Sequence, residues 1–450
     1  MNSTTGLRRT LQRRHMQMIA IGGVIGAGLF VGSGVVIASA GPAAVISFAL
    51  TGTLVVLVMR MLGEMAVAYP VIGGFYEYSR LALGDLAGFL TGWMYWYFWI
   101  IVVALEAVAG AKLLGHWWPT VQPWQFTLGL TGLFTVVNLL SVRSYGEAEF
   151  WFASIKVVAI IVFLAAGTAF VLGFWPSAPG GFAHLTAHGG FAPNGITHVL
   201  TGAVAATGFY FGTEIVTVAA AESAEPEKAV AQAMQSVIWR VLIFYVGSIF
   251  LVVTILPWND PARMQQPYVS VLEALNVPGA ATIMSAIILT AVLSALNSGL
   301  FASSRMLMAL AAKGDAPHFF ARLDGRGVPV AALFAGTAFA YAAVVMSYVS
   351  PDRVFAFLVN SYGTVAIFVY VLIAVSQLKL RRRLERDSPE RLRMRMWFYP
   401  HLTRFAILLM LLIVAAMAII PDQRAPLIFG LVSVAVLLAA FGIRRLIRRS

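Results

Sequence analysis

Three ionisable residues lie inside long apolar stretches of the sequence. They are Glu106, Lys156 and Glu214. A charged side chain at the centre of a bilayer costs about 2.5 to 3.5 kcal/mol on insertion scales, so residues of this kind are functional candidates by default. A desolvated lysine can lose its proton near neutral pH. We interpret Lys156 as a candidate proton carrier, Glu106 as a candidate acceptor for an amine, and Glu214 as a candidate gate.

Glycine is unusually frequent between residues 20 and 34, where it occurs six times in fifteen positions. Each glycine costs roughly 1 kcal/mol relative to alanine inside a helix. The spacing of Gly22 to Gly26, and of Gly28 to Gly32, would allow two helices to pack closely. The same glycines also suit a helix that unwinds at membrane depth, which is tolerated where the freed backbone lines a cavity. We favour the unwound segment, and the close-packing alternative stays open.

A second stretch, residues 207–214, also combines two glycines and an acid within an apolar segment. Breaks at corresponding positions of two repeats indicate the binding site of a transporter. Freed N–H groups attract a carboxylate and freed C=O groups attract an ammonium, so an amino acid suits such a site. Aromatic residues here are candidates for a lid, although core packing is an alternative role. The residues expected to bind the ligand, besides Glu106, are Gly26, Ala27, Gly28, Phe209, Tyr210, Phe211 and Gly212.

Polar side chains recur at helical spacing on a later segment that we expect to face Lys156. They are Thr290, Ser294, Asn297 and Ser298. This stripe could line a polar site, or it could form hydrogen bonds between helices worth about 0.6 kcal/mol each. A fixed ion pair that holds helices together remains the structural alternative for Lys156.

About twelve apolar stretches are long enough to position these residues as membrane-spanning helices. They lie roughly at 16–39, 44–68, 86–113, 124–141, 150–173, 197–219, 236–257, 279–311, 328–348, 353–377, 402–420 and 425–443. The chain of 450 residues is 60% hydrophobic and only 11% charged, which is too little charge to coat several soluble domains. The sequence therefore predicts an all-α polytopic membrane protein with both ends on one side.

The net charge of +12 indicates orientation once the basic residues are placed. All but Lys112, Arg263, Arg353 and Arg424 fall at or toward one face, with clusters before the first span, between the tenth and eleventh, and after the last. Positive-inside bias places that face in the cytoplasm. Nucleic-acid binding is excluded as the reason for the high pI. Cysteine is absent, which excludes a disulfide scaffold and a thiolate site.

The longest loop on the opposite face, residues 174–196, contains His184 and His188 four residues apart. That spacing could hold a metal on a helix, but the glycines around it argue against a helix. We expect two solvated histidines and no metal. The first apolar run also ends in a sequence like a signal-peptide cleavage site, but it is too long and too rich in glycine for a signal peptide.

Several motifs resemble amino acid permeases of the amino acid–polyamine–organocation superfamily from about residue 7 to the C-terminus. They are GGVIGAGLF at 22–30 with AGP at 40–42, MRMLGEM at 59–65, GTE at 212–214, LNS at 296–298, RML at 305–307, GDAP at 314–317 and RLRMRMW at 391–397. Within this superfamily the chain most resembles bacterial GABA permeases, at SVIWR (236–240), LPWN (256–259) and AVSQL (374–378). Residues 210–211 beside Gly212 depart from the relatives' pattern.

This resemblance implies a LeuT-like fold, in which two inverted repeats of five helices are followed by two further helices, with helices one and six broken. The repeats would span about 16–173 and 197–377 of a transport core at 16–377. The cytoplasmic parts would be an N-terminal segment at 1–15, a basic loop at 378–401 and a tail at 444–450, with the last two helices in 402–443. The resemblance also implies that a lysine at the place of Lys156 replaces a sodium ion.

The expected function is proton-coupled symport of an amino acid, with GABA as the best candidate, across a bacterial inner membrane. The alternatives are a permease for an aromatic, cationic or proline substrate, or an amino acid exchanger. An enzyme is disfavoured because no span carries a metal-ligand cluster or a nucleophile with a base. A channel would favour a continuous polar pore. The expected partners are the amino acid and membrane lipid, with a proton as coupling ion and no cofactor, while the oligomeric state is open.

Overall fold

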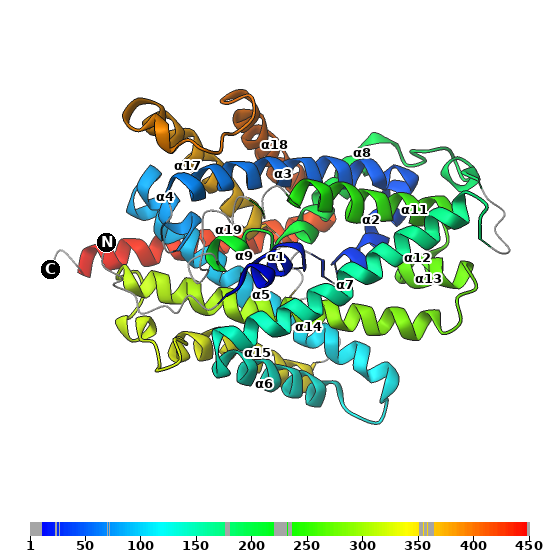
Figure 1. Ribbon diagram of the computed structural model, residues 1–450, viewed down its shortest axis with the longest axis horizontal. Coiled ribbons are helices and arrows are strands. Elements are labelled where there is room, and N and C mark those ends of the chain that lie inside the picture. The colour runs from blue at the N-terminus through cyan, green and yellow to red at the C-terminus, as the bar shows by residue number, and fades with distance from the viewer. Residues whose placement is uncertain are drawn as a thin grey trace.

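The computed structural model describes residues 11–22, 25–26, 28–69, 71, 73–175, 181–219, 232, 236–350, 354, 358 and 364–447. Ala27, one of the expected ligand-binding residues, lies outside this described part. The regular structure of the described residues is helical throughout, as expected for an all-α membrane protein. Its helices run mainly along the long axis of the molecule (Figure 1).

The first part of the chain forms nine helical elements. They are α1 (Arg13–Gly22), the π-helix η1 (Gly28–Gly32), α2 (Ser33–Ala40), the 3₁₀ turn η2 (Gly41–Ala43), α3 (Ala44–Ala68), α4 (Phe75–Leu83), α5 (Asp85–Trp117), α6 (Pro123–Leu140) and α7 (Val142–Val171). Local sequence marks the helix starts: Pro123 begins α6 behind a Gln122–Gln125 capping box, and the Ser141 hydroxyl caps α7.

The second part begins with η3 (Ala183–Leu185), α8 (Gly195–Ala206), η4 (Thr207–Tyr210) and α9 (Ile215–Ala219). It continues with η6 (Arg240–Gly247), α11 (Ser248–Ile255), α12 (Pro261–Gln265), α13 (Pro267–Ala274), α14 (Ala280–Ala312), η7 (His318–Ala321) and α15 (Val330–Val349). The chain closes with α17 (Val365–Asp387), η8 (Pro389–Arg391), α18 (His401–Ile419) and α19 (Pro421–Ile447).

Nine helices among the described residues are long and apolar enough to cross a membrane. One of them, Gly28–Ala68, covers two of the expected spans, because α2 and α3 are joined through η2 at the positive-φ residue Gly41. The helices α6 and α17 match expected spans but are not among the nine. The described structure thus supports a multi-pass membrane protein, while the number twelve remains a prediction.

Helical geometry changes within both glycine-rich stretches. Ahead of α2, a π-helical turn begins at Gly28. After α8, a 3₁₀ turn ends at Tyr210, Gly212 has φ +110°, and α9 begins only at Ile215. A positive φ is accessible to glycine at little cost, which explains this residue at the change of direction. Both stretches therefore leave the regular α-helix where the glycine content predicts a departure.

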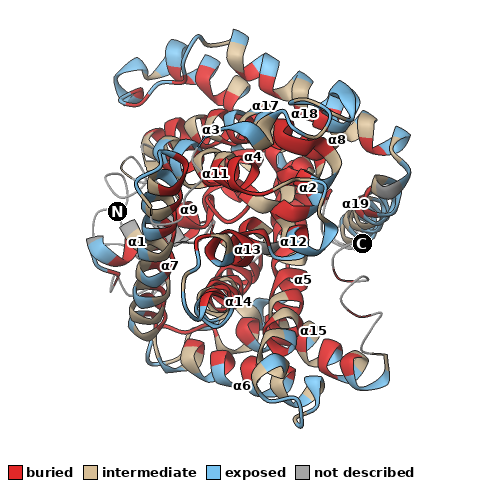
Figure 2. Cartoon of the chain, turned by 90° about the vertical axis from the view of Figure 1, so that its right-hand side faces the viewer, coloured by how far each residue is buried: buried red, intermediate tan, exposed pale blue. Residues whose placement is uncertain are grey.

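The centre of the molecule is built around α5 and α14, which pack along each other. Buried positions gather on these helices and on α2 and α3, whereas α6, α18 and α19 turn many exposed positions outward (Figure 2). Large apolar side chains such as Val158, Leu411 and Val432 are exposed on the outer helices. Such a surface would make a soluble protein aggregate, but it suits helices that face lipid.

Several helix ends meet at one end of the molecule, which we call the basic end: the ends of α3, α14, α17 and α19 and the starts of α4 and α5. Arg381 of α17 pairs with Glu64 of α3, and Gln377 donates a 2.7 Å hydrogen bond to the same carboxylate. Arg60 of α3 donates a 2.9 Å hydrogen bond to the carbonyl oxygen of Arg395. The helix α17 continues to Asp387, so the first part of the expected 378–401 loop is helical.

Candidate functional site

The carboxylate of Glu106 points from α5 toward the glycine-rich stretch of the first span. A Cβ atom placed on Gly26 would lie 4.0 Å from Glu106 Oε1. The second oxygen, Oε2, is buried and has no hydrogen-bond partner among the described residues. A buried carboxylate oxygen without a donor is unfavourable unless a ligand supplies one. A ligand ammonium beside Gly26 would supply such a donor, and the role of Glu106 as an acceptor for an amine stays a prediction.

Lys156 lies in the centre of a polar cluster between α7 and α14. Its side chain is only 1% exposed, and its Nζ donates a 2.8 Å hydrogen bond to Ser294 Oγ. The Ser294 hydroxyl in turn donates a 2.6 Å hydrogen bond to Glu149 Oε1. Both Glu149 and Glu106 interact electrostatically with the lysine. A serine from the predicted polar stripe thus contacts the lysine.

The other members of that stripe have different partners. Asn297 accepts a 3.0 Å hydrogen bond from Asn138 of α6, and Thr290 donates to the carbonyl oxygen of Ile287 in its own helix. Ser298 lies 3.5 Å from the hydroxyl of Tyr145. One part of the stripe therefore forms a site around Lys156, and the rest includes contacts between and within helices.

Glu149 is a buried acid that sequence reasoning missed. It is fully buried in α7, seven residues before Lys156, so both side chains lie on the same face of that helix. The fifth span is predicted to start at residue 150, so Glu149 falls just outside the predicted apolar stretch. The signal that would have found it is the spacing to Lys156 on one helix face.

Glu214 binds back onto the irregular backbone just before it. Gly212 N–H donates to both carboxylate oxygens, at 3.3 and 3.2 Å, and the Tyr370 hydroxyl donates to Oε2 at 3.1 Å. A small cavity beside it is lined by aromatic residues that include Tyr95, Phe98 and Phe211. The N–H group of Gly212, one of the expected ligand-binding residues, thus donates to Glu214 in this conformation.

The neighbouring aromatic residues face different surroundings. Phe209 packs over the π-helical turn, where a Cβ atom on Gly28 or on Gly32 would come within 2.6 Å of its ring. Phe211 stacks on Tyr370 at 4.4 Å between ring centroids, beside the cavity. Tyr210 is fully buried and donates a 2.8 Å hydrogen bond to the carbonyl oxygen of Phe48. Phe209 and Phe211 therefore lie beside the two irregular stretches, and Tyr210 packs toward α3.

The two loop histidines stack on each other with ring centroids 6.2 Å apart. Burial lowers the pKa of His184, and the positive charges of His188 and Arg263 lower it further. Within the described ranges, no group of three or more His, Asp or Glu side chains gathers as a metal site would require.

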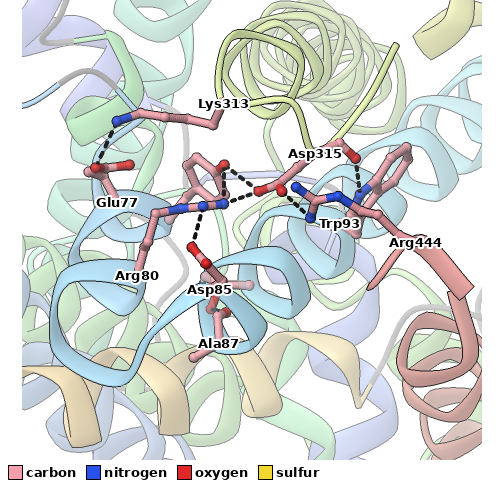
Figure 3. A network of polar contacts seen from close by, with 10 residues as sticks. Glu77, Arg80, Asp85, Ala87, Trp93, Lys313, Asp315 and Arg444 are labelled. Carbon is pink, nitrogen blue, oxygen red and sulfur yellow. Dashed lines mark hydrogen bonds and ion pairs between the residues drawn. The ribbon is translucent and has the colours of Figure 1, made fainter. Parts of the chain in front are cut away.

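A second polar network lies at the basic end around the buried carboxylate of Asp315 (Figure 3). Arg80 and Arg444 each form an ion pair with it, and the Tyr76 hydroxyl donates a 2.7 Å hydrogen bond. Beside them Lys313 pairs with Glu77 at 3.0 Å. The network joins α4, α19 and the segment that follows α14, so the last helix is tied to helices from the first half of the chain.

Comparison with known proteins agrees with this architecture. The amino acid permease family model matches residues 15–447. The chain is 51% identical to a gamma-aminobutyric acid permease of Bacillus subtilis, over 98% of this chain and 94% of that protein. It is 49% identical to a probable GABA permease of Pseudomonas aeruginosa, with 92% and 88% covered. It is 40% identical to the aromatic amino acid transport protein AroP of Corynebacterium glutamicum, with 92% and 90% covered. The chain therefore belongs to the amino acid permease family.

Proposed function

We propose that this permease carries GABA, together with a proton, across the bacterial inner membrane by alternating access. Relatives named as GABA permeases, or as a probable one, are 45% to 51% identical to it over nearly the full length. The aromatic amino acid transporter at 40% identity keeps an aromatic substrate as the main alternative. Exchange of amino acids is a second alternative, and cationic amino acids and proline remain further candidates.

The observation that carries this proposal is the Glu106 carboxylate beside Gly26, whose Oε2 has no hydrogen-bond partner among the described residues. In an α-amino acid the ammonium lies next to the carboxylate, so one backbone break can meet both groups. GABA has its ammonium at the far end of a carbon chain, which requires a separate acceptor. We assign the ammonium to Glu106 and the carboxylate to freed N–H groups at Gly26, Ala27 and Gly28.

Two further elements complete the proposed site. Phe209 and Phe211 would close over the bound amino acid, with Tyr210 and Gly212 as parts of the same irregular segment. Glu214 would act as a gate that exchanges its hydrogen bond with Gly212 N–H for others when the segment moves. The packing of Phe209 on Gly28 supports these assignments.

The proposed architecture is a LeuT-like core of ten helices in two inverted repeats, at 16–173 and 197–377, followed by two helices in 402–443. The segments 1–15, 378–401 and 444–450 would lie in the cytoplasm. The basic end supports this topology, because the ends of α3, α14, α17 and α19 meet there, as alternating spans require. Its arginines support a cytoplasmic position by the positive-inside rule.

The function is tested with the full-length protein in proteoliposomes. An acidic exterior should drive labelled GABA to accumulate inside, and unlabelled GABA should compete better than phenylalanine, arginine or proline. Equilibration without accumulation would indicate a channel or facilitator, and counterflow without any proton requirement would indicate an exchanger. Stronger competition by phenylalanine would replace GABA by an aromatic substrate.

Lys156→Arg tests the proton step. Arginine keeps the positive charge but does not deprotonate in proteins, so the variant should fold and keep counterflow while losing accumulation driven by the pH step. The exposed Lys112 near the C-terminal end of α5 offers a matched control, because Lys112→Arg should accumulate GABA like the wild type. Normal accumulation by Lys156→Arg would exclude Lys156 as the proton carrier.

A further inference from the structure

The neighbours of Lys156 form a short chain of hydrogen bonds that ends on a second titratable group. The chain runs from Lys156 Nζ to Ser294 Oγ at 2.8 Å, and from Ser294 Oγ to Glu149 Oε1 at 2.6 Å. Ser294 accepts at one side and donates at the other, which is the arrangement that passes a proton between its two neighbours. All three side chains are almost completely buried.

We propose that Glu149 takes the proton from Lys156 through the hydroxyl of Ser294 during each transport cycle. This inference rests on the proposed function, in which Lys156 loses and regains a proton. One N–H bond of the ammonium breaks and its proton passes to Ser294 Oγ, while the original hydroxyl proton passes to Glu149 Oε1. The serine is restored, and a charged pair becomes a neutral amine and a neutral carboxylic acid.

The surroundings favour a transfer that leaves two neutral groups. A buried ion pair carries a large desolvation penalty for both charges, and moving one proton between them removes both charges together. The net charge of the pair is zero before and after the step, so nothing else in the protein has to compensate. A static counter-ion would need only one contact with the lysine, whereas here a hydroxyl is placed between the two charges.

Other polar groups face the Glu149 carboxylate and surround the proton that it would receive from Lys156. Asn297 and Ser298 of α14 face its carboxylate, and the Tyr145 hydroxyl lies beyond Ser298. Glu149 Oε2 has no hydrogen-bond partner among the described residues. Glu106 is the other carboxylate that interacts with Lys156, but it faces Gly26. The two acids therefore have separate tasks, with Glu106 for the substrate amine and Glu149 for the proton.

The position of Glu149 along α7 gives the transfer a direction. This helix begins at Val142, and Arg14 before the first span pairs with Glu147 near that start. Glu149 lies closer to this end than Lys156 does, by about two helical turns. Transfer from Lys156 to Glu149 thus moves the proton toward the face that we place in the cytoplasm, as uptake requires.

The test uses full-length protein in proteoliposomes that contain a trapped pH indicator. Glu149→Gln should keep GABA counterflow, because exchange needs no net proton movement. Accumulation driven by the pH step, and the proton influx evoked by GABA, should fall by about 100-fold, the lower end of what a positioned acid or base contributes. Glu147→Gln, which removes a partly exposed acid from the same helix, should behave like the wild type.

Variants of Ser294 keep the proposal testable if Glu149→Gln does not fold. Ser294→Ala should lose coupled accumulation and retain counterflow, and Ser294→Thr should restore coupling because it restores a hydroxyl. Full coupling in Glu149→Gln or in Ser294→Ala would overturn the relay. Loss of both counterflow and accumulation in a folded Glu149→Gln would also overturn it, because that result indicates a fixed ion pair. Absence of GABA-evoked proton influx in the wild type would instead reject the proposed proton coupling itself.

Discussion

The charges of Glu106, Glu149 and Lys156 suggest how substrate and proton depend on each other. With all three ionised, the cluster carries two negative charges and one positive charge in a region shielded from water. Bound GABA is a zwitterion and leaves the net charge unchanged, but its ammonium neutralises Glu106 locally while its carboxylate is held by backbone N–H groups. The proton on Lys156 then balances Glu149, so binding of GABA and the proton on Lys156 stabilise the same state. Charge balance in a low-dielectric site thus couples the binding of GABA to the protonation of Lys156 without direct contact between the two.

Glu106→Gln should weaken GABA binding by about 100-fold, because a charge-assisted hydrogen bond to the ammonium is replaced by a neutral one and the charge balance is lost. Competition of unlabelled GABA against labelled GABA measures this change in affinity. The variant should bind neutral-side-chain α-amino acids nearly as well as the wild type. Unchanged affinity and selectivity would make Glu106 a buried structural acid.

Glu214→Gln tests the gate. The variant keeps the size of the side chain but loses the charge that accepts hydrogen bonds from Gly212 N–H and Tyr370. A charge-assisted hydrogen bond contributes about 1.5 to 3 kcal/mol, so we expect turnover to change about tenfold or more while GABA affinity changes less. Initial rates of GABA uptake at several pH values measure this change in turnover. Wild-type turnover at every pH would remove Glu214 from the gating mechanism.

Among the helical elements, the two irregular stretches are coupled through one side chain. Phe209 follows α8 and its ring lies against Gly28 and Gly32 of η1. A movement of the α8–α9 segment therefore has to move the ring across the surface of the first span. The absence of side chains at these two glycines leaves the space in which that ring lies, which gives the glycine content a specific structural reason.

Gly28→Ala should disturb this coupling. Its Cβ atom would come within 2.6 Å of the Phe209 ring, and overpacking of this kind costs typically about 1 to 3 kcal/mol. We expect slower uptake and a lower unfolding temperature in detergent. Gly132→Ala on α6 is the control, since no atom lies within 4 Å of a Cβ atom there, and alanine should leave uptake unchanged. Equal behaviour of the two variants would show that Phe209 does not restrict the first span.

Across the whole molecule, charged side chains from distant parts of the chain meet at the basic end. Asp315 follows α14, Arg80 lies in α4 and Arg444 is near the C-terminal end of α19, yet their side chains meet in one buried network (Figure 3). Opening toward this end has to separate some of these groups. The network therefore contributes to the balance between the conformations that alternating access requires.

Asp315→Asn should destabilise the conformation described here, because two arginines would then face each other without the negative charge between them. Breaking a buried pair in this way costs about 3 kcal/mol or more, which thermal unfolding in detergent would detect. Asp387→Asn, which removes an exposed partner of Arg386, should change nothing measurable. A wild-type unfolding temperature and uptake rate in Asp315→Asn would mean that the network does not hold this end closed.

Prediction from the sequence succeeded where the evidence is local to one segment. Apolar length places helices such as α3, α5 and α14 within a few residues, and the glycines near 28 and 212 mark departures from the regular helix. The acid and the amine at membrane depth, Glu106 and Lys156, could be recognised because each interrupts an apolar run. Glu149 was missed because it stands at the edge of such a run, so that only its seven-residue spacing to Lys156 marks it in the sequence.

The sequence by itself determined the class of protein and the approximate helices, because apolar length acts segment by segment. The cytoplasmic side of the basic residues stays a prediction from the sequence. Only the tertiary structure decided which polar groups meet. Glu149 and Ser294 are far apart along the chain, and so are Asp315 and Arg80. Their hydrogen bonds and ion pairs exist because helix packing brings their faces together and excludes water. The proposed path of the proton is therefore a property of the packed helices.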